Sequence, residues 1–180
     1  MMVPCRQCRP SRFLDLAGKE TVRVLFVCTG NTCRSPMAEA IFRERAAHRL
    51  GVSPQKLFEH DLDVLSAGVA AGGNSPASWQ AVEVMKQHGI DVGQHLSQPV
   101  TDEMLEGSDL VFTLTPGHLD VLRHARPDLQ DRMRTLRADG RGISDPYGGS
   151  VEQYQECAKE ITECLEEILD SIITKDSTGT

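Results

Sequence analysis

The chain has 180 residues, of which 39% are hydrophobic and 25% are charged. These values lie near the globular average and exclude collagen-like, low-complexity and largely disordered chains. The net charge of −7 argues against general nucleic-acid binding, which needs a basic surface. The longest apolar run, residues 24–28, is far shorter than the roughly 20 residues that span a bilayer, so we expect no membrane partner.

Six cysteines are unusual in so small a chain. An even number of cysteines indicates a disulfide framework only in short secreted proteins, and the N-terminus lacks the apolar stretch of a signal peptide. We therefore expect a cytoplasmic protein whose thiols are mostly reduced. Residues 1–20 are basic and without periodicity, which predicts a flexible extension before a single domain over 21–174 and a short tail over 175–180.

The first half of the chain predicts two strands, each followed by a helix. Residues 22–28 form a β-branched and apolar run of strand length. Over 36–50 apolar residues recur at three- and four-residue spacings, as in an amphipathic helix, and Ser35 is the expected N-cap. A second strand is expected over 63–67, and a Gly-rich loop then leads to a helix over 76–88.

The second half continues the alternation. It predicts a strand over 109–115, a short helix over 116–124 and a weaker strand over 132–136. After a further loop, a capping box that starts at Ser150 opens a last amphipathic helix, which reaches residue 172. Strands that alternate with helices predict an α/β fold, here one four-stranded parallel sheet with helices on both faces. Sites in such folds lie outside the carboxyl ends of the strands.

At that edge the sequence places Cys28, with Arg34 six positions later. A tight loop that enters a helix turns successive N–H groups toward one point, and the helix N-terminus adds positive potential. Gly30 and Asn31 tolerate the unusual backbone angles of such a loop. Arg34 can bind phosphate oxygens through two parallel hydrogen bonds, and Ser35 can donate to the sulfur. The pattern predicts a thiolate that faces an oxyanion site, and hence covalent phosphoryl transfer. The alternative is a buried cysteine before an ordinary turn.

Phosphoryl transfer also needs a proton donor for the leaving group. Asp145 is the best candidate, because it lies in a Gly-rich loop and Pro146 biases it toward an extended conformation that can project over a site. Alone, an Asp-Pro pair is usually a turn. Asp145 is a candidate acid because the loop after the first strand, from Cys28 to Arg34, already predicts phosphoryl transfer.

Four segments together resemble the low-molecular-weight protein tyrosine phosphatase family. They are VCTGNTCRSPMAEA over 27–40, SAG over 66–68, DLVFTLT over 109–115 and DPYGGS over 145–150. The resemblance covers about residues 22–173 and implies a phosphocysteine intermediate with no cofactor and no metal. It implies that Cys28 is the nucleophile, Arg34 the phosphate clamp and Asp145 the acid and then the base. The implied phosphate- and substrate-binding residues are Thr29, Gly30, Asn31, Thr32, Cys33, Ser35 and Tyr147.

The substrate preference depends on two departures from the tyrosine-directed members. These members carry Ile or Leu where this chain has Thr32, and an aromatic residue in the loop where this chain has VAAGGN over 69–74. Only Tyr147 is left as a ring that could stack on a substrate. Thr32 together with the DPYGG loop resembles the bacterial subgroup that acts on protein phosphoarginine. We therefore expect phosphorylated proteins as partners, inorganic phosphate as product and phosphoarginine as the favoured substrate, with phosphotyrosine as the alternative.

Two other functions are compatible with the same fold. An arsenate reductase would need a mobile pair of resolving cysteines near the loop, and a phospho-residue binding module would have lost one of the three catalytic side chains. The resemblance implies that Cys33 can trap oxidised Cys28 as a disulfide, and the alternative is that it packs behind the loop. We expect Cys157 and Cys164 to be core residues. We expect Trp79 to pack against the protein, with a substrate platform as the alternative, whereas the Cys5 and Cys8 pair has no assigned role.

Overall fold

The computed structural model describes residues 21–173 and contains one four-stranded parallel sheet. Strand β1 (Val22–Cys28) pairs with β2 (Leu62–Gly68) on one side and with β3 (Leu110–Thr113) on the other, and β4 (Met133–Thr135) lies at the edge beyond β3. The four predicted strands and their parallel arrangement are therefore confirmed. The order β2-β1-β3-β4 places the carboxyl end of β1 in the middle of one sheet edge.

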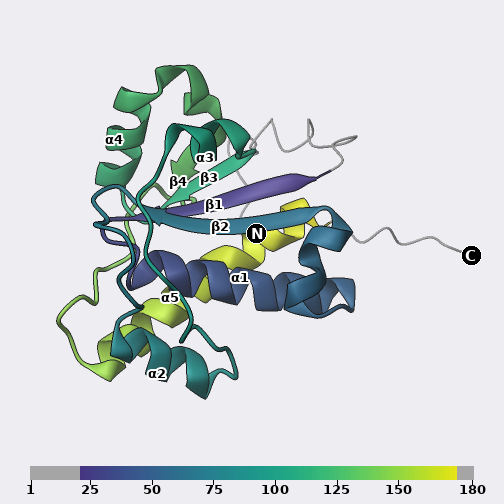
Figure 1. Cartoon of the computed structure of the whole chain (residues 1–180), viewed down its shortest axis with the longest axis vertical. Coiled ribbons are helices and arrows are strands. Elements are labelled where there is room, and N and C mark those ends of the chain that lie inside the picture. The colour runs from purple at the N-terminus through teal and green to yellow at the C-terminus, as the bar shows by residue number, and fades with distance from the viewer. Residues whose placement is uncertain (1–20, 174–180) are drawn as a thin grey trace, which may run out of the picture.

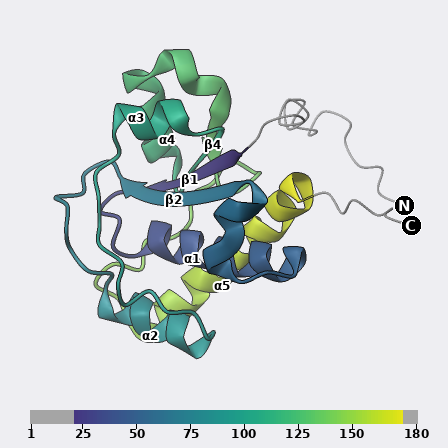
Figure 2. The same cartoon turned by 45° about the vertical axis from the view of Figure 1, so that its right-hand side comes forward.

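Helices cover both faces of the sheet (Figures 1 and 2). Three of them, α1 (Arg34–Leu50), α2 (Trp79–Gln87) and α5 (Val151–Ile172), lie on one face, and α3 (Asp102–Gly107) and α4 (Pro116–Ala125) lie on the other. The three-layer α/β fold is the one that the alternation of strands and helices predicts.

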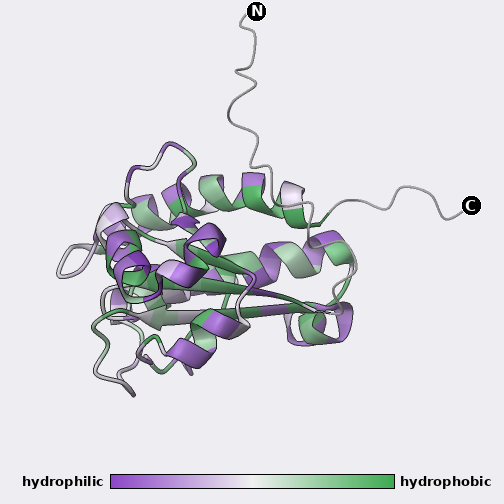
Figure 3. Ribbon diagram, turned by 90° about the horizontal axis from the view of Figure 1, so that it is seen from above, coloured by the Kyte–Doolittle hydropathy of each residue, from purple (hydrophilic) through white to green (hydrophobic). Residues whose placement is uncertain are grey.

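Each face of the sheet has its own core. Side chains alternate along a strand, so Val24 and Phe26 enter the core under α1, α2 and α5, while Leu25 and Val27 enter the core under α3 and α4. All four are fully buried, which explains why residues 24–28 of β1 form an unbroken apolar run. Figure 3 shows the same pattern, because hydrophobic residues dominate the strands whereas the helices mix both kinds.

Two helix starts differ from the prediction. Helix α1 begins at Arg34, so Ser35 is not its N-cap but a fully buried residue of its first turn. Helix α2 begins only at Trp79, because the backbone at Pro76 is occupied by an antiparallel bridge to Leu96. Its N-cap is Ser78, whose hydroxyl accepts a hydrogen bond from the N–H of Ala81.

The other differences concern short elements. The sequence did not indicate α3 or the two short 3₁₀ helices, η2 (Pro54–His60) and η3 (Pro127–Arg132). These segments are one or two turns long, which is too short for a periodic apolar pattern. The capping box at the start of α5 is confirmed, since the side chains of Ser150 and Gln153 each bond the backbone of the other.

Some predictions lie outside the described residues, namely the basic extension over 1–20 with Cys5 and Cys8, and the tail over 175–180. Between residues 21 and 173 no helix is long and apolar enough to cross a membrane.

Candidate active site

The loop after β1 encloses the sulfur of Cys28. The side chain of Cys28 is only 2% exposed, and its Sγ lies 3.0 Å from Ser35 Oγ and accepts a hydrogen bond of 3.3 Å from the N–H of Asn31. Asn31 adopts a left-handed conformation with φ of 54°, which turns that N–H inward. The loop thus surrounds the sulfur with polar groups that can donate hydrogen bonds to it.

Asn31 also ties the loop to the rest of the fold. Its side-chain amide donates to Ser35 Oγ and to Ser66 Oγ, both at 2.9 Å. Its side-chain oxygen accepts from the N–H of Gln98 at 2.9 Å, and its backbone carbonyl accepts from His95 Nε2 at 2.7 Å. A fully buried asparagine with all of these partners keeps the loop in one conformation.

The SAG segment contributes a close contact with the same loop. A Cβ atom on Gly68 would lie 2.5 Å from the carbonyl oxygen of Thr29 and 2.9 Å from the N of Asn31. Only glycine allows this approach. The backbone then continues alongside the loop, where the N–H groups of Val69 and Ala70 donate to the carbonyls of Cys28 and Thr29 at 2.9 Å.

Arg34 lies beneath the mouth of the loop and is 4% exposed. Its Nη2 forms an ion pair of 2.6 Å with Asp145 and a hydrogen bond of 3.5 Å to Thr29 Oγ1, while Nη1 donates to the carbonyl of Ile143 at 3.3 Å. The remaining donor, Nε, is buried and has no hydrogen-bond partner among the residues described. A buried N–H without a partner is rare, and an oxyanion in the loop is the ligand that would satisfy it.

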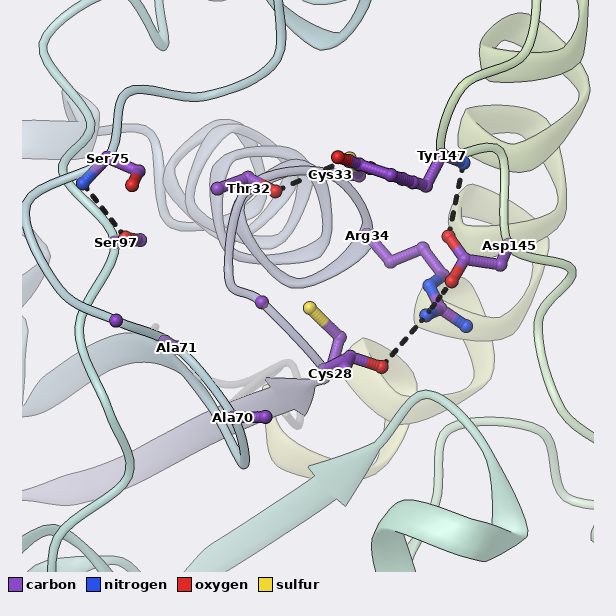
Figure 4. Close-up of a pocket in the computed structure, with 13 residues that line it drawn as sticks. Cys28, Thr32, Cys33, Arg34, Ala70, Ala71, Ser75, Ser97, Asp145 and Tyr147 are labelled. Carbon is purple, nitrogen blue, oxygen red and sulfur yellow. Dashed lines mark hydrogen bonds and ion pairs between the residues drawn. The ribbon is translucent and has the colours of Figure 1, made fainter.

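Asp145 reaches the site from a distant part of the chain, 111 residues after Arg34. Its carboxylate is about half-exposed, and Oδ1 accepts a hydrogen bond of 3.2 Å from the N–H of Tyr147. Figure 4 shows Asp145 and Tyr147 together on one side of the Cys28 sulfur, and Ala70 and Ala71 on the other. The carboxylate is thus placed at the entrance, where a leaving group would depart.

These side chains surround a pocket of about 350 Å³. Its lining residues are Cys28, Thr29, Gly30, Thr32, Cys33, Arg34, Ala70, Ala71, Gly72, Ser75, Ser97, Asp145 and Tyr147. Of the catalytic and binding residues that the sequence predicts, all but Asn31 and Ser35 line the pocket, and the side chains of these two are fully buried. A buried thiol that lies beside the Asn31 N–H and near an arginine can bind and attack a phosphoryl group.

Comparison with known proteins agrees with this chemistry. The family model described as low molecular weight phosphotyrosine protein phosphatase matches residues 23–178. The chain belongs to this family. It is therefore a phosphatase, a hydrolase of phosphorylated substrates.

Bacterial relatives match nearly the whole of this phosphatase. A protein-arginine-phosphatase of Bacillus subtilis is 37% identical over 149 residues, which cover 81% of this chain and 93% of the relative. The low molecular weight protein-tyrosine-phosphatase PtpB of Staphylococcus aureus is 32% identical over 154 residues, which cover 84% and 99%. Among solved structures, the YwlE arginine phosphatase from Geobacillus stearothermophilus has a TM-score of 0.74 at 31% identity, covering 88% and 99%.

The walls of the phosphatase pocket are poor in aromatic rings. Tyr147, which is 77% exposed, is the one aromatic residue among those that line it. The opposite wall consists of small residues from 70–72 and of Ser75 and Ser97. Thr32 lines the pocket and places its hydroxyl 3.6 Å from Cys33 Sγ.

Cys33 also lines the pocket and is 5% exposed. Its Sγ is 3.1 Å from the hydroxyl of Tyr154, a fully buried residue of α5. Burial, together with the hydrogen bond to Cys33, raises the pKa of Tyr154 to about 12, so its hydroxyl keeps the proton and can donate to the sulfur. The contact anchors the loop to α5, and the disulfide between Cys28 and Cys33 stays a prediction.

Sequence reasoning missed His118. This residue lies in the first turn of α4 and is 7% exposed, and its Nε2 is 2.8 Å from Thr29 Oγ1. Burial, and secondarily the charge of Arg34, lowers the pKa of His118 to about 4, against a small opposing effect of Asp145. The signal was its position at the start of the helix that follows β3, which brings it to the edge of the sheet where sites form.

Of the three residues predicted to pack, two do so and one does not. Cys157 is buried and Cys164 is partly buried against the same core, and burial raises the pKa of these thiols to about 12 and about 11. Both therefore pack as predicted. The prediction for Trp79 is wrong, because its side chain is 66% exposed at the first position of α2. Within residues 21–173 no group of three or more His, Cys, Asp or Glu side chains could hold a metal ion.

Proposed function

We propose that this phosphatase removes phosphoryl groups from protein arginine residues through a phosphocysteine intermediate. The observation that carries the proposal is the arrangement of Cys28, Arg34 and Asp145 around one pocket whose wall offers a Thr32 hydroxyl in place of an aliphatic side chain. The Bacillus subtilis and Geobacillus stearothermophilus relatives, 37% and 34% identical, are named protein-arginine phosphatases, which supports this choice of substrate.

In the first step the Cys28 thiolate attacks phosphorus. The P–S bond forms as the P–N bond to the arginine side chain breaks, and protonated Asp145 gives its proton to the leaving nitrogen. The loop N–H groups and Arg34 bind the phosphoryl oxygens throughout, so the charge of the transition state is stabilised without reorganisation. In the second step Asp145 takes a proton from water, which attacks phosphorus. The P–S bond breaks, and inorganic phosphate and the thiolate are released.

The ion pair between Arg34 and Asp145 explains how the acid is set free. Without substrate, the Asp145 carboxylate accepts a hydrogen bond of 2.6 Å from Arg34 Nη2. A bound phosphoryl group competes for the same donor and brings its own negative charge, and two neighbouring anions favour protonation of one of them. Substrate binding thus frees Asp145 from Arg34, so that its carboxyl group can act as the acid of the first step.

The choice between phosphoarginine and phosphotyrosine depends on the side chains that form the pocket walls. A phosphotyrosine ring is held best between aromatic side chains, and a missing ring weakens such binding by about 0.5–1.5 kcal/mol beyond the lost area. The guanidinium of phosphoarginine is polar and planar and carries several donors. Thr32 Oγ1 and the Asp145 carboxylate are acceptors at the rim that suit it.

The test compares kcat/KM for peptides that carry phosphoarginine or phosphotyrosine, using the wild type and Thr32→Ile. We expect the wild type to prefer phosphoarginine and the substitution to move the preference toward phosphotyrosine. Thr162→Ile, on α5 and not among the pocket-lining residues, is the matched control and keeps the wild-type preference. A wild type that prefers phosphotyrosine tenfold or more would replace the proposal with the phosphotyrosine alternative.

No observation favours arsenate reduction or a binding module without catalysis. Cys157 lies inside α5, buried and with a raised thiol pKa, so it is not a mobile resolving thiol. The three residues that a binding module would have lost are present and share one pocket. The partners that we propose are phosphorylated proteins, with inorganic phosphate as the product. We also propose a cytoplasmic location, which suits the free thiols at Cys28, Cys33, Cys157 and Cys164.

A further inference from the structure

We propose that His118 is a positioning residue that turns the Thr29 hydroxyl hydrogen toward the bound phosphoryl group. The inference rests on the proposed phosphatase function and adds a contact to the same site. Thr29 directly follows Cys28 and lines the pocket, whereas His118 reaches it from behind, 89 residues later in the chain.

The position of His118 is well defined. The Thr115 side chain caps α4 and accepts a hydrogen bond from the N–H of His118, so the histidine backbone is held at the first turn. The ring is almost completely buried, and its Nε2 lies 2.8 Å from Thr29 Oγ1. The same oxygen accepts a second, longer hydrogen bond of 3.5 Å from Arg34 Nη2.

The unsatisfied atom of the ring identifies its tautomer. Because burial lowers the pKa of His118 to about 4, the ring is neutral at physiological pH and carries one N–H. Nδ1 is buried and has no hydrogen-bond partner in the described part of the chain. An unpaired buried N–H is rarer in proteins than an unpaired acceptor. The proton therefore resides on Nε2, and the ring donates to Thr29 Oγ1.

That donation determines what the Thr29 hydroxyl can do. A hydroxyl has two acceptor positions and one hydrogen. His118 and Arg34 occupy the two acceptor positions, so the hydrogen takes the remaining tetrahedral direction. Thr29 is exposed and lines the pocket above Cys28. A phosphoryl oxygen bound there receives one more hydrogen bond, beyond those from the loop N–H groups and Arg34.

A proton-transfer role for His118 is a different hypothesis, and pH distinguishes the two. The charged groups that face the ring are Arg34 and Asp145, and its bonded neighbour is Thr29. A ring that only positions Thr29 stays neutral between pH 5.5 and 8. The ratio of wild-type to His118→Leu activity is then constant over that range. A ratio that changes tenfold would contradict the positioning role.

The main experiment is a double-substitution cycle with His118→Leu and Thr29→Val. Two quantities are measured for each protein, kcat/KM for para-nitrophenyl phosphate and Kd for inorganic phosphate. A hydrogen bond to a charged group is worth about tenfold or more, so we expect each single substitution to lower kcat/KM about tenfold and to weaken phosphate binding. The double variant should be no worse than Thr29→Val alone, because His118 acts only through that hydroxyl.

Conservative variants keep the test informative if His118→Leu does not fold. Thr29→Ser retains the hydroxyl and His118→Gln retains a donor of similar reach, so both should keep most of the wild-type values. Equal values for Thr29→Val and Thr29→Ser would overturn the proposal, as would a full additional tenfold loss in the double variant. A wild type that binds phosphate without any turnover refutes the catalytic function instead, and the Kd values then still test His118.

Discussion

At the scale of single residues, the site depends on charges that change partners. Arg34 is buried and has three hydrogen-bond partners, namely Asp145, Thr29 and the Ile143 carbonyl, while its Nε has no partner among the residues described. A buried guanidinium cannot lose its charge, so an anion must always be close to it. In the unliganded protein that anion is Asp145, and during turnover it is the phosphoryl group. Catalysis and anion binding therefore respond differently to the loss of this carboxylate.

Asp145→Ala should lower kcat by roughly 10² to 10⁴, the usual contribution of a general acid. The same variant should bind inorganic phosphate at least as tightly as the wild type, because Arg34 no longer has an internal carboxylate to release. Steady-state kinetics and calorimetric phosphate titration measure the two effects. Asp139→Asn, in an exposed loop cluster away from the pocket, is the control that keeps the wild-type kcat. An unchanged kcat in Asp145→Ala would remove this residue from the mechanism.

Ser35→Ala removes the hydroxyl that lies 3.0 Å from Cys28 Sγ. Because that hydroxyl can donate its hydrogen to the sulfur as well as to the Ala67 carbonyl, we expect slower alkylation of Cys28 by iodoacetamide at neutral pH and a lower kcat. Ser171→Ala, near the end of α5 and outside the pocket lining, is the matched control. Alkylation of Ser35→Ala at the wild-type rate would show that the loop N–H groups alone stabilise the thiolate.

At the scale of elements, the site is a junction of backbone segments that approach each other closely. Strand β1 ends at Cys28, α1 starts at Arg34, and the last residue of β2, Gly68, lies directly against the loop between them. The loop's shape is thus determined by contacts to β2 as much as by its own residues. This explains why the SAG segment accompanies the loop in the family resemblance.

Gly68→Ala should displace the loop, since its Cβ would lie 2.5 Å from the Thr29 carbonyl oxygen. We expect a loss of phosphate binding and a decrease of about 1–3 kcal/mol in the free energy of unfolding, the usual cost of overpacking. Gly72→Ala in the same segment meets no atom within 4 Å and should leave stability unchanged. Denaturant titration of both variants compares them directly, and similar curves would contradict the close approach seen here.

At the scale of the whole molecule, the fold buries the ring of His118 between helix α4 and the active site. His118 has a pKa of about 4 in the folded protein, against about 6.5 in an unfolded chain. Between these two values the unfolded state binds more protons. The free energy of unfolding therefore falls as the pH is lowered from 6.5 to about 4. The stability that His118 supplies in its neutral form is complete above pH 6.5.

His118→Leu should flatten this part of the stability profile. The measurement is the free energy of unfolding from denaturant titrations at several pH values between 4 and 7, for the wild type and the variant. Carboxylates contribute equally to both profiles, so their difference isolates the histidine. His124→Leu is the control, because that residue is exposed at the end of α4 and should leave the slope unchanged. Identical slopes for wild type and His118→Leu would contradict the buried neutral ring.

The sequence by itself determined the fold class and the chemistry of the loop, because both are encoded locally. Alternating apolar runs and amphipathic helices specify a parallel α/β sheet, and seven consecutive residues from Cys28 to Arg34 specify an anion-binding turn around a thiol. Asp145 was a weaker prediction, because an Asp-Pro pair in a Gly-rich loop is usually only a turn, and its role as the acid depended on the loop after β1 and on the family resemblance. Local propensity misplaced the start of α2 and made Ser35 the N-cap of α1, since in both cases contacts to distant segments decide the local conformation.

Only the tertiary structure decided which distant residues meet. Arg34 and Asp145 are 111 residues apart, and Thr29 and His118 are 89 residues apart. These pairs exist because the strand order β2-β1-β3-β4 brings the segments that follow β3 and β4 to the end of β1. The four cysteines of the described residues likewise have no common role, since Cys28 is held by the loop, Cys33 contacts Tyr154, and the other two pack along α5. Burial and neighbours determine the chemistry of a thiol or an imidazole, and both are properties of the folded chain.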